Sequence, residues 1–214
     1  SYTSGIVYVD SSATGANNGS SWADAFTDLQ DALEAELICD NIDTIKVAQG
    51  TYYPSDTMIV YDNCSELPND TIFPDRFASF SLPDSVVILG GYGRGADSLI
   101  RDWECNKTIL CGDIDVNSAH AGNSYHVVST FTVSDRTVVD GFDITFGYAD
   151  GGSNPNNFDR GAGWFNKGDF YYDDNIGGYI NITSNPFLRN IKFYNNHAIT
   201  EGGGMANQFH GNAT

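Results

Sequence analysis

The C-terminal part of the chain repeats one short pattern, and this repeat restricts the fold more than any other feature of the sequence. Two segments correspond at a constant offset of 49 residues, and the glycine-rich motifs that follow them, 161–166 and 202–207, correspond at an offset of 41. A unit of this size cannot bury its own apolar side, so the units must stack on one another. The pairs at the first offset are Val139 with Leu188, Gly141 with Asn190, Phe142 with Ile191, Ile144 with Phe193 and Ala149 with Ala198.

Stacked repeats with short apolar runs predict an all-β fold, a solenoid of parallel β coils. Successive coils lie about 4.8 Å apart, so equivalent side chains touch: apolar ones inside, and asparagines in hydrogen-bonded ladders at the turns. The glycines at 202–204 allow a backbone turn with positive φ. The alternative is a β-sandwich or antiparallel barrel with ordinary hairpin glycines, which leaves the repeat unexplained. Strands are predicted at 6–9, 44–47, 86–89, 108–110, 126–130, 137–139, 142–146, 179–182 and 187–193.

One segment has the spacing of an amphipathic helix. From Trp22 to Leu37 the apolar residues recur at the intervals of one helical face, and Ser20 or Ser21 can serve as the N-cap. This predicts a helix over 22–38. The stretches 54–79 and 150–160 contain proline, glycine and asparagine with little periodicity, and are predicted to be loop insertions in a single domain over 1–214.

The charge balance limits the partners. The chain has 28 acidic and 10 basic side chains and a net charge of −18, whereas a nucleic-acid-binding surface needs clustered Lys and Arg. Anionic membrane surfaces are disfavoured for the same reason. No stretch approaches the roughly 20 apolar residues of a membrane-spanning helix. With 41% hydrophobic and 18% charged residues, the composition predicts a packed core rather than a disordered chain.

Seven segments carry a likeness to a known family: 6–10, 14–26, 47–54, 89–92, 101–103, 108–113 and 124–128. Together they resemble the right-handed parallel β-helix repeat proteins of the pectin-lyase-like class, which occur in large secreted and surface proteins of bacteria. The segments 193–196 and 202–204 have a weaker similarity to polymorphic outer-membrane autotransporters of the same architecture. The resemblance implies that the helix covers the N-terminal end of the β-helix.

No covering segment follows the last repeat motif before Thr214, and no signal peptide opens the chain. We therefore expect the N-terminal part of a longer protein, secreted or on the cell surface, whose signal peptide was removed before Ser1. The expected function is that of an adhesin or structural stalk, with carbohydrate or a cell-surface protein as partner. The alternative is a polysaccharide lyase or glycoside hydrolase of the same fold. A third interpretation is a passenger recognised by secretion machinery.

The enzymatic alternative requires converging carboxylates and a cation. Asp169, Asp173 and Asp174 could line a groove beside Arg160 and Lys167. The simpler interpretation of this tract is an acidic, aromatic surface loop, and no catalytic residue is assigned. His120, His126, His197 and His210 have no partner at a recognisable spacing, and His126, inside a predicted strand, is expected to be structural.

One loop has the oxygen-rich alternation of a calcium site. Asp113, Asp115 and Asn117 could present side-chain oxygens to a structural Ca²⁺. Ser118 replaces the glycine of an EF-hand loop and Ser124 replaces its bidentate glutamate, which argues against an EF-hand. The alternative is a polar turn between coils.

Two further patterns concern covalent modification. The four cysteines Cys39, Cys64, Cys105 and Cys111 allow two disulfides with three connectivities, or free thiols, and lack zinc-site spacing. Asp-Ser/Thr-apolar tripeptides resemble the O-glycosylation signal of bacteria that export such proteins by the type IX pathway; the alternative is a turn that leads into a strand. The candidate glycosylation sites are Thr44, Thr57, Thr71, Ser85 and Ser98.

Overall fold

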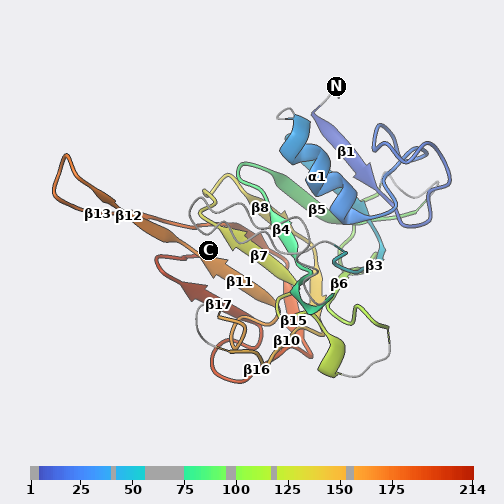
Figure 1. Ribbon diagram of the computed structural model, residues 1–214. Helices are drawn as coiled ribbons and strands as arrows, with labels where there is room; N and C mark the ends of the chain where they lie inside the picture. The colour runs from blue at the N-terminus through green and yellow to red at the C-terminus, as the bar shows by residue number, and fades with distance from the viewer. Residues whose placement is uncertain (1–4, 40–41, 56–74, 95–99, 117–119, 153–156) are drawn as a thin grey trace.

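The computed structural model describes residues 5–39, 42–55, 75–94, 100–116, 120–152 and 157–214. This part of the chain is all-β, with one α-helix and three parallel sheets of four or five strands (Figure 1). No helix among these residues is long and apolar enough to cross a membrane.

The three larger sheets each gather strands from distant parts of the chain. Every strand pair within them is parallel. Sheet 1 contains, in spatial order, β1 (Ile6–Val9), β2 (Thr44–Ala48), β5 (Val87–Tyr92), β8 (Val138–Asp140) and β14 (Phe187–Arg189). Sheet 2 contains β3 (Gly50–Tyr52), β6 (Thr108–Cys111), β9 (Asp143–Thr145) and β15 (Lys192–Tyr194). Sheet 3 contains β4 (Phe80–Leu82), β7 (Val128–Phe131), β11 (Trp164–Lys167) and β17 (Met205–Gln208).

The chain visits these sheets repeatedly in the same order. From β2 onward, each pass takes a strand from sheet 1, then one from sheet 2, then one from sheet 3. The last two passes add a short strand before sheet 3, and these strands, β10 (Tyr148–Ala149) and β16 (His197–Ala198), pair in parallel. Each pass therefore lies against the one before it, as the sequence repeat requires.

The observed register confirms the repeat residue by residue. Val139 pairs with Leu188, Ile144 with Phe193 and Ala149 with Ala198, all at the predicted offset of 49. The later motifs pair at the offset of 41, with Trp164 opposite Met205. The repeated residues occupy equivalent positions in successive passes.

Because the pairing is parallel and in register, apolar side chains form one ladder on each sheet. These ladders meet in a single core. Their members are fully or nearly fully buried in the early passes, whereas Leu188, Phe193 and Met205 in the last pass are only partly buried. The ladders are Val7–Ile45–Ile88–Val139–Leu188, Tyr52–Leu110–Ile144–Phe193 and Phe80–Val128–Trp164–Met205.

A polar ladder accompanies the core on sheet 3. Thr130 Oγ1 donates to Asn166 Oδ1 at 2.9 Å, and Asn166 Nδ2 donates to Asn207 Oδ1 at 2.8 Å. Thr130 and Asn166 are fully buried, so these bonds satisfy groups that would otherwise be costly to bury. Asparagines of successive passes thus hydrogen-bond to each other as predicted, but inside β11 and β17 and not at a turn.

The helix α1 (Leu29–Cys39) begins seven residues later than predicted. The segment before it pairs with β1 instead: Phe26 forms a parallel bridge with Val9, and its N–H donates to the Tyr8 carbonyl at 2.9 Å. Backbone pairing has therefore outweighed helical periodicity. The buried apolar face of the helix is also shorter than predicted, because Leu29 and Leu33 are buried whereas Leu37 is 66% exposed. The helix packs against β1 and β4.

The N-cap of this helix is Asp28, not Ser20 or Ser21. Its Oδ1 accepts the N–H of Gln30 at 2.9 Å, which satisfies one of the free amides of the first turn. Asp28→Ala is expected to lower the free energy of unfolding by about 1 kcal/mol, measured by urea denaturation. Asp28→Asn keeps an acceptor oxygen, so it should cost less. Equal losses in the two variants would contradict the capping role.

One pair of strands lies outside the parallel sheets. β12 (Asp169–Asp173) and β13 (Gly178–Ile182) form an antiparallel hairpin, which projects away from the body of the protein (Figure 1). The sequence predicts a strand at 179–182 but only a surface loop at 169–173. Other strands also lie outside the predicted set, and the predicted strand 187–193 is broken into β14 and β15 at Asn190, whose φ is +51°. The strands that the sequence analysis missed are β3, β4, β10, β11, β16 and β17.

Candidate functional site

The hairpin β12–β13 exposes more large apolar side chains than any comparably short part of the described chain. The exposed fractions are 47% for Phe170, 49% for Tyr171, 54% for Tyr172 and 68% for Tyr179. At its tip Ile176 is 65% exposed. Contiguous apolar exposure of this kind is typical of interaction sites, so the hairpin is the candidate functional site.

The register divides the hairpin into two faces, because directly opposed residues point to the same side and neighbours alternate. The acidic face carries two carboxylates on β12 that flank Tyr171. The aromatic face carries three rings. The acidic face consists of Asp169, Tyr171, Asp173, Ile180 and Ile182, and the aromatic face of Phe170, Tyr172, Tyr179 and Asn181.

The rings of the aromatic face contact one another. Tyr179 packs edge-to-face against Phe170 and Tyr172, with ring centroids 5.5 and 5.2 Å apart. Phe209, after β17, lies 6.4 Å from Phe170. Such pairs contribute about 0.5–1.5 kcal/mol each beyond their buried area. They stabilise a hairpin that makes few other contacts.

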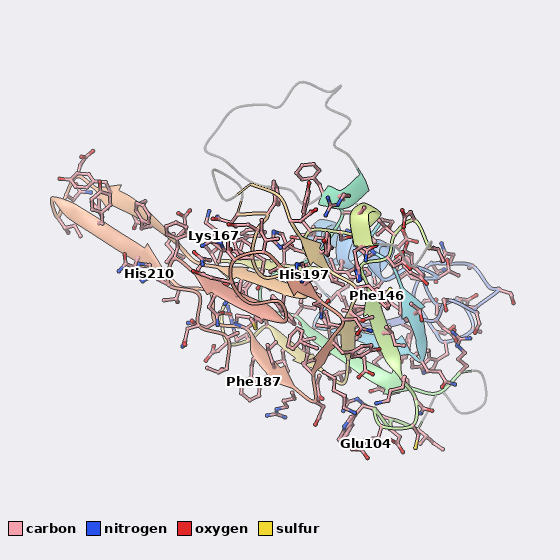
Figure 2. The ribbon with its side chains drawn as sticks, turned by 90° about the horizontal axis from the view of Figure 1, so that it is seen from below. Glu104, Phe146, Lys167, Phe187, His197 and His210 are labelled. Carbon is pink, nitrogen blue, oxygen red and sulfur yellow. The ribbon has the colours of Figure 1, made fainter. Side chains whose placement is uncertain are left out.

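The base of the hairpin is held by close backbone packing. A Cβ at Gly168 would collide with the carbonyl oxygens of Phe209 and Ile182, so only glycine fits there. The Lys167 ammonium lies 5.4 Å from the Phe209 ring centroid, and Figure 2 shows Lys167 beside the base of the hairpin. The hairpin is therefore anchored to the last pass of the sheets.

The structure gives no support to a catalytic groove built from the residues considered above. Asp169 and Asp173 lie on the hairpin and Asp174 at its turn, all beyond the sheets. Arg160 pairs with Asp159 at 3.0 Å and with Glu201 at 3.5 Å. No ion pair in the described chain joins Arg160 or Lys167 to these three aspartates. The segment 169–174 is therefore an acidic, aromatic surface element, as the simpler interpretation predicts, but most of it forms the strand β12 and not a loop.

The candidate calcium loop is only partly described. Asp113 is buried and Asp115 exposed, and the Val116 N–H donates to the Asp113 carbonyl at 3.1 Å, forming a turn. Asn117 lies outside the described residues. Within them, no three His, Cys, Asp or Glu side chains are close enough to hold a metal ion. Calcium binding at this loop stays a prediction.

The glycosylation candidates differ in accessibility. Thr44 is half-buried in β2, between β1 and β5. Ser85 is half-buried in the turn before β5, and its hydroxyl donates to Asp84 Oδ2 at 3.0 Å, which fits the interpretation as a turn. Thr57, Thr71 and Ser98 lie outside the described residues.

Of the four cysteines, two have described side chains. Cys105 is exposed and Cys111 buried, and both carry free thiols. Burial raises the pKa of the Cys111 thiol above its usual range, which makes it a poor nucleophile at neutral pH. The side chain of Cys39 and all of Cys64 lie outside the described part.

Three aromatic side chains from successive passes stack on one another. His120 and His197 lie on either side of Tyr148, with ring centroids 5.2 and 5.1 Å from the tyrosine. Phe146 lies 6.3 Å from His120, and Figure 2 shows Phe146 and His197 on the same part of the body. Tyr148 and His197 lie at the repeat offset of 49 and pair between β10 and β16, so the repeat carries the signal for their contact. His120 lies in a short 3₁₀ helix outside the repeat, so its place in the stack required the structure.

His126 is buried in the core, but it precedes β7 and does not lie inside a strand as predicted. Its ring is 2% exposed and stacks on Phe165 at 4.8 Å. Nδ1 lies 3.1 Å from the Gly161 carbonyl; because a carbonyl only accepts, Nδ1 carries the hydrogen and Nε2 does not. Burial lowers the pKa of His126 to about 4, against smaller opposing effects of the Gly161 bond and Asp159.

Comparison with known proteins adds no relative. No protein-family model, curated protein or solved structure matches the chain.

Proposed function

We propose that this protein is a secreted or cell-surface protein that acts as a rigid stalk or adhesin. The observation that carries the proposal is the set of three parallel sheets in register, from which an acidic and aromatic hairpin projects. In-register stacking of apolar ladders makes a stiff body. A hairpin with exposed rings is a surface for contact.

The finer architecture that we propose is a right-handed parallel β-helix capped at its N-terminal end by α1. The constant order in which the chain visits the three sheets supports this architecture, since each pass then corresponds to one coil. Packing of α1 against β1, the first strand of sheet 1, supports the cap. Such a cap shields the strand edges that would otherwise pair with other chains.

The net charge of the protein also supports the proposal of a stacked β-protein outside the cell. A net charge of −18 keeps copies of the protein apart by repulsion. Carbohydrate or a protein on another cell is the expected target. Export by the type IX pathway, with sugars on the Asp-Ser/Thr sites, is part of the same proposal.

Two measurements test this function. Immunogold labelling of intact producing cells is expected to place the protein on the outer surface or in the medium, and beads coated with it should adhere to cells more than beads coated with albumin. Labelling confined to the cell interior would contradict the proposal. Release of unsaturated or reducing ends from polygalacturonate by the pure protein would also contradict the proposal, and would favour the alternative of a polysaccharide lyase or glycoside hydrolase.

A further inference from the structure

The hairpin β12–β13 is incomplete as a sheet. In the described chain each of its strands has a neighbour on one side only, and an isolated two-stranded hairpin is marginally stable in water. Its outer main-chain edges are therefore open to a further strand, apart from the Phe170 N–H, which donates to Asp169 Oδ1 at 2.8 Å and would have to exchange this bond for one to the added strand. Addition of an extended segment to such an edge is a common mode of protein recognition.

The charge of the hairpin indicates the kind of segment that fits. Between Gly168 and Leu188 the chain has three acidic residues, Asp169, Asp173 and Asp174, and no Lys or Arg. Asp169 and Asp173 lie on the same face. A strand paired beside β12 would place alternate side chains next to these carboxylates, where cations are favoured.

The opposite face favours apolar side chains. The other set of alternate residues in an added strand would lie beside the rings of Phe170 and Tyr172 on β12, with the Tyr179 ring one strand further away. Aromatic rings pair favourably with β-branched residues across strands. The two faces together select a segment in which cationic and β-branched residues alternate.

We propose that the hairpin β12–β13 binds an extended segment of another protein, with alternating cationic and apolar residues, as a third strand. The proposal rests on the adhesive function above and names the partner class of its contact surface. A second copy of this chain is a poor occupant because its hairpin and its net charge are acidic. A neutral glycan would offer no cation to the carboxylates of Asp169 and Asp173.

The test uses labelled synthetic peptides and the purified protein. The probe is an eight-residue peptide of alternating Lys and Val, and binding is followed by fluorescence anisotropy. A Glu–Val peptide of the same length tests charge, and a Lys–Pro peptide keeps the charge but cannot pair as a strand. The Lys–Val peptide is expected to bind saturably, and both controls at least about tenfold more weakly.

The variant Asp169→Asn/Asp173→Asn removes both charges of the acidic face. It is expected to bind the Lys–Val peptide about tenfold more weakly, as two cross-strand charge pairs predict. The matched control Glu104→Gln/Asp135→Asn removes two exposed charges elsewhere and should bind like the unmodified protein. Amide hydrogen exchange should slow in 169–182 when the Lys–Val peptide is bound.

Three results would overturn the proposal. The first is no binding of the Lys–Val peptide, and the second is binding of the Lys–Pro peptide with the same affinity. The third is an equal loss of affinity for the Lys–Val peptide in the two double variants. A dimer that disappears when the hairpin is shortened would identify a second copy as the occupant, and hairpin-dependent binding of a neutral oligosaccharide would identify a glycan. Peptide binding without surface location would overturn the adhesive function only; adhesion that survives loss of the hairpin would overturn this proposal only.

Discussion

Trp164→Ala is expected to lower the free energy of unfolding by about 3–5 kcal/mol, the range for loss of a fully buried large aromatic side chain. Trp164 is fully buried in β11, in register between Val128 and Met205. Its indole N–H donates to Thr130 Oγ1 at 2.8 Å. The substitution leaves a cavity in the core and removes this donor. Urea denaturation followed by circular dichroism measures the effect.

Trp164→Phe is the matched control for this cavity. Phenylalanine retains most of the apolar contact with Val128 and Met205 but not the hydrogen bond, so a smaller loss is expected. Trp22→Ala gives a second comparison, because Trp22 is only half-buried and lies outside sheet 1, against Tyr8 and Tyr92. A loss for Trp164→Ala no larger than that for Trp22→Ala would contradict the assigned core.

His126 is expected to make the protein acid-sensitive. Its pKa of about 4 in the folded state lies below the usual 6.5 of the unfolded chain. The unfolded state therefore binds the proton more readily between these values, and stability falls as the pH is lowered from 6.5 to 4. The histidine alone should cost about 2 kcal/mol between pH 7 and pH 5, and about 3 kcal/mol in full.

The variant His126→Gln separates this contribution from the carboxylates. Glutamine does not titrate, so the variant should be less stable at pH 7 but lose about 2 kcal/mol less than the unmodified protein on going to pH 5. The measurement is urea denaturation of both proteins at each pH. Parallel stability curves for the two proteins would show that His126 does not titrate in this window.

Much of the parallel architecture was accessible from the sequence because stacked positions face the same neighbours. The offsets that relate Val139 to Leu188 and Trp164 to Met205 are the register of the sheets. Each position in one pass must match the side chain below it, and that requirement is visible as a repeat. The earlier passes differ in length, so their register required the structure.

The elements that escaped prediction are fixed by contacts between distant residues. The helix starts at Leu29 because the preceding segment pairs with β1, which no local pattern reveals. The segment that forms β12 was predicted to be a loop because it lacks the alternation of apolar and polar residues that marks a half-buried strand. Both of its faces are exposed, and its sequence consists of three aromatic residues between two aspartates. Its pairing with β13 supplies the missing information.

The three apolar ladders tie each pass to the passes on either side of it. Ile45, Ile88 and Val139 follow one another on sheet 1 in consecutive passes, so the side chain in the middle packs between the other two. The stability of such a stack is approximately a sum of contributions within each pass and contributions between neighbouring passes. A defect at one position in the middle of a ladder therefore weakens two interfaces at once.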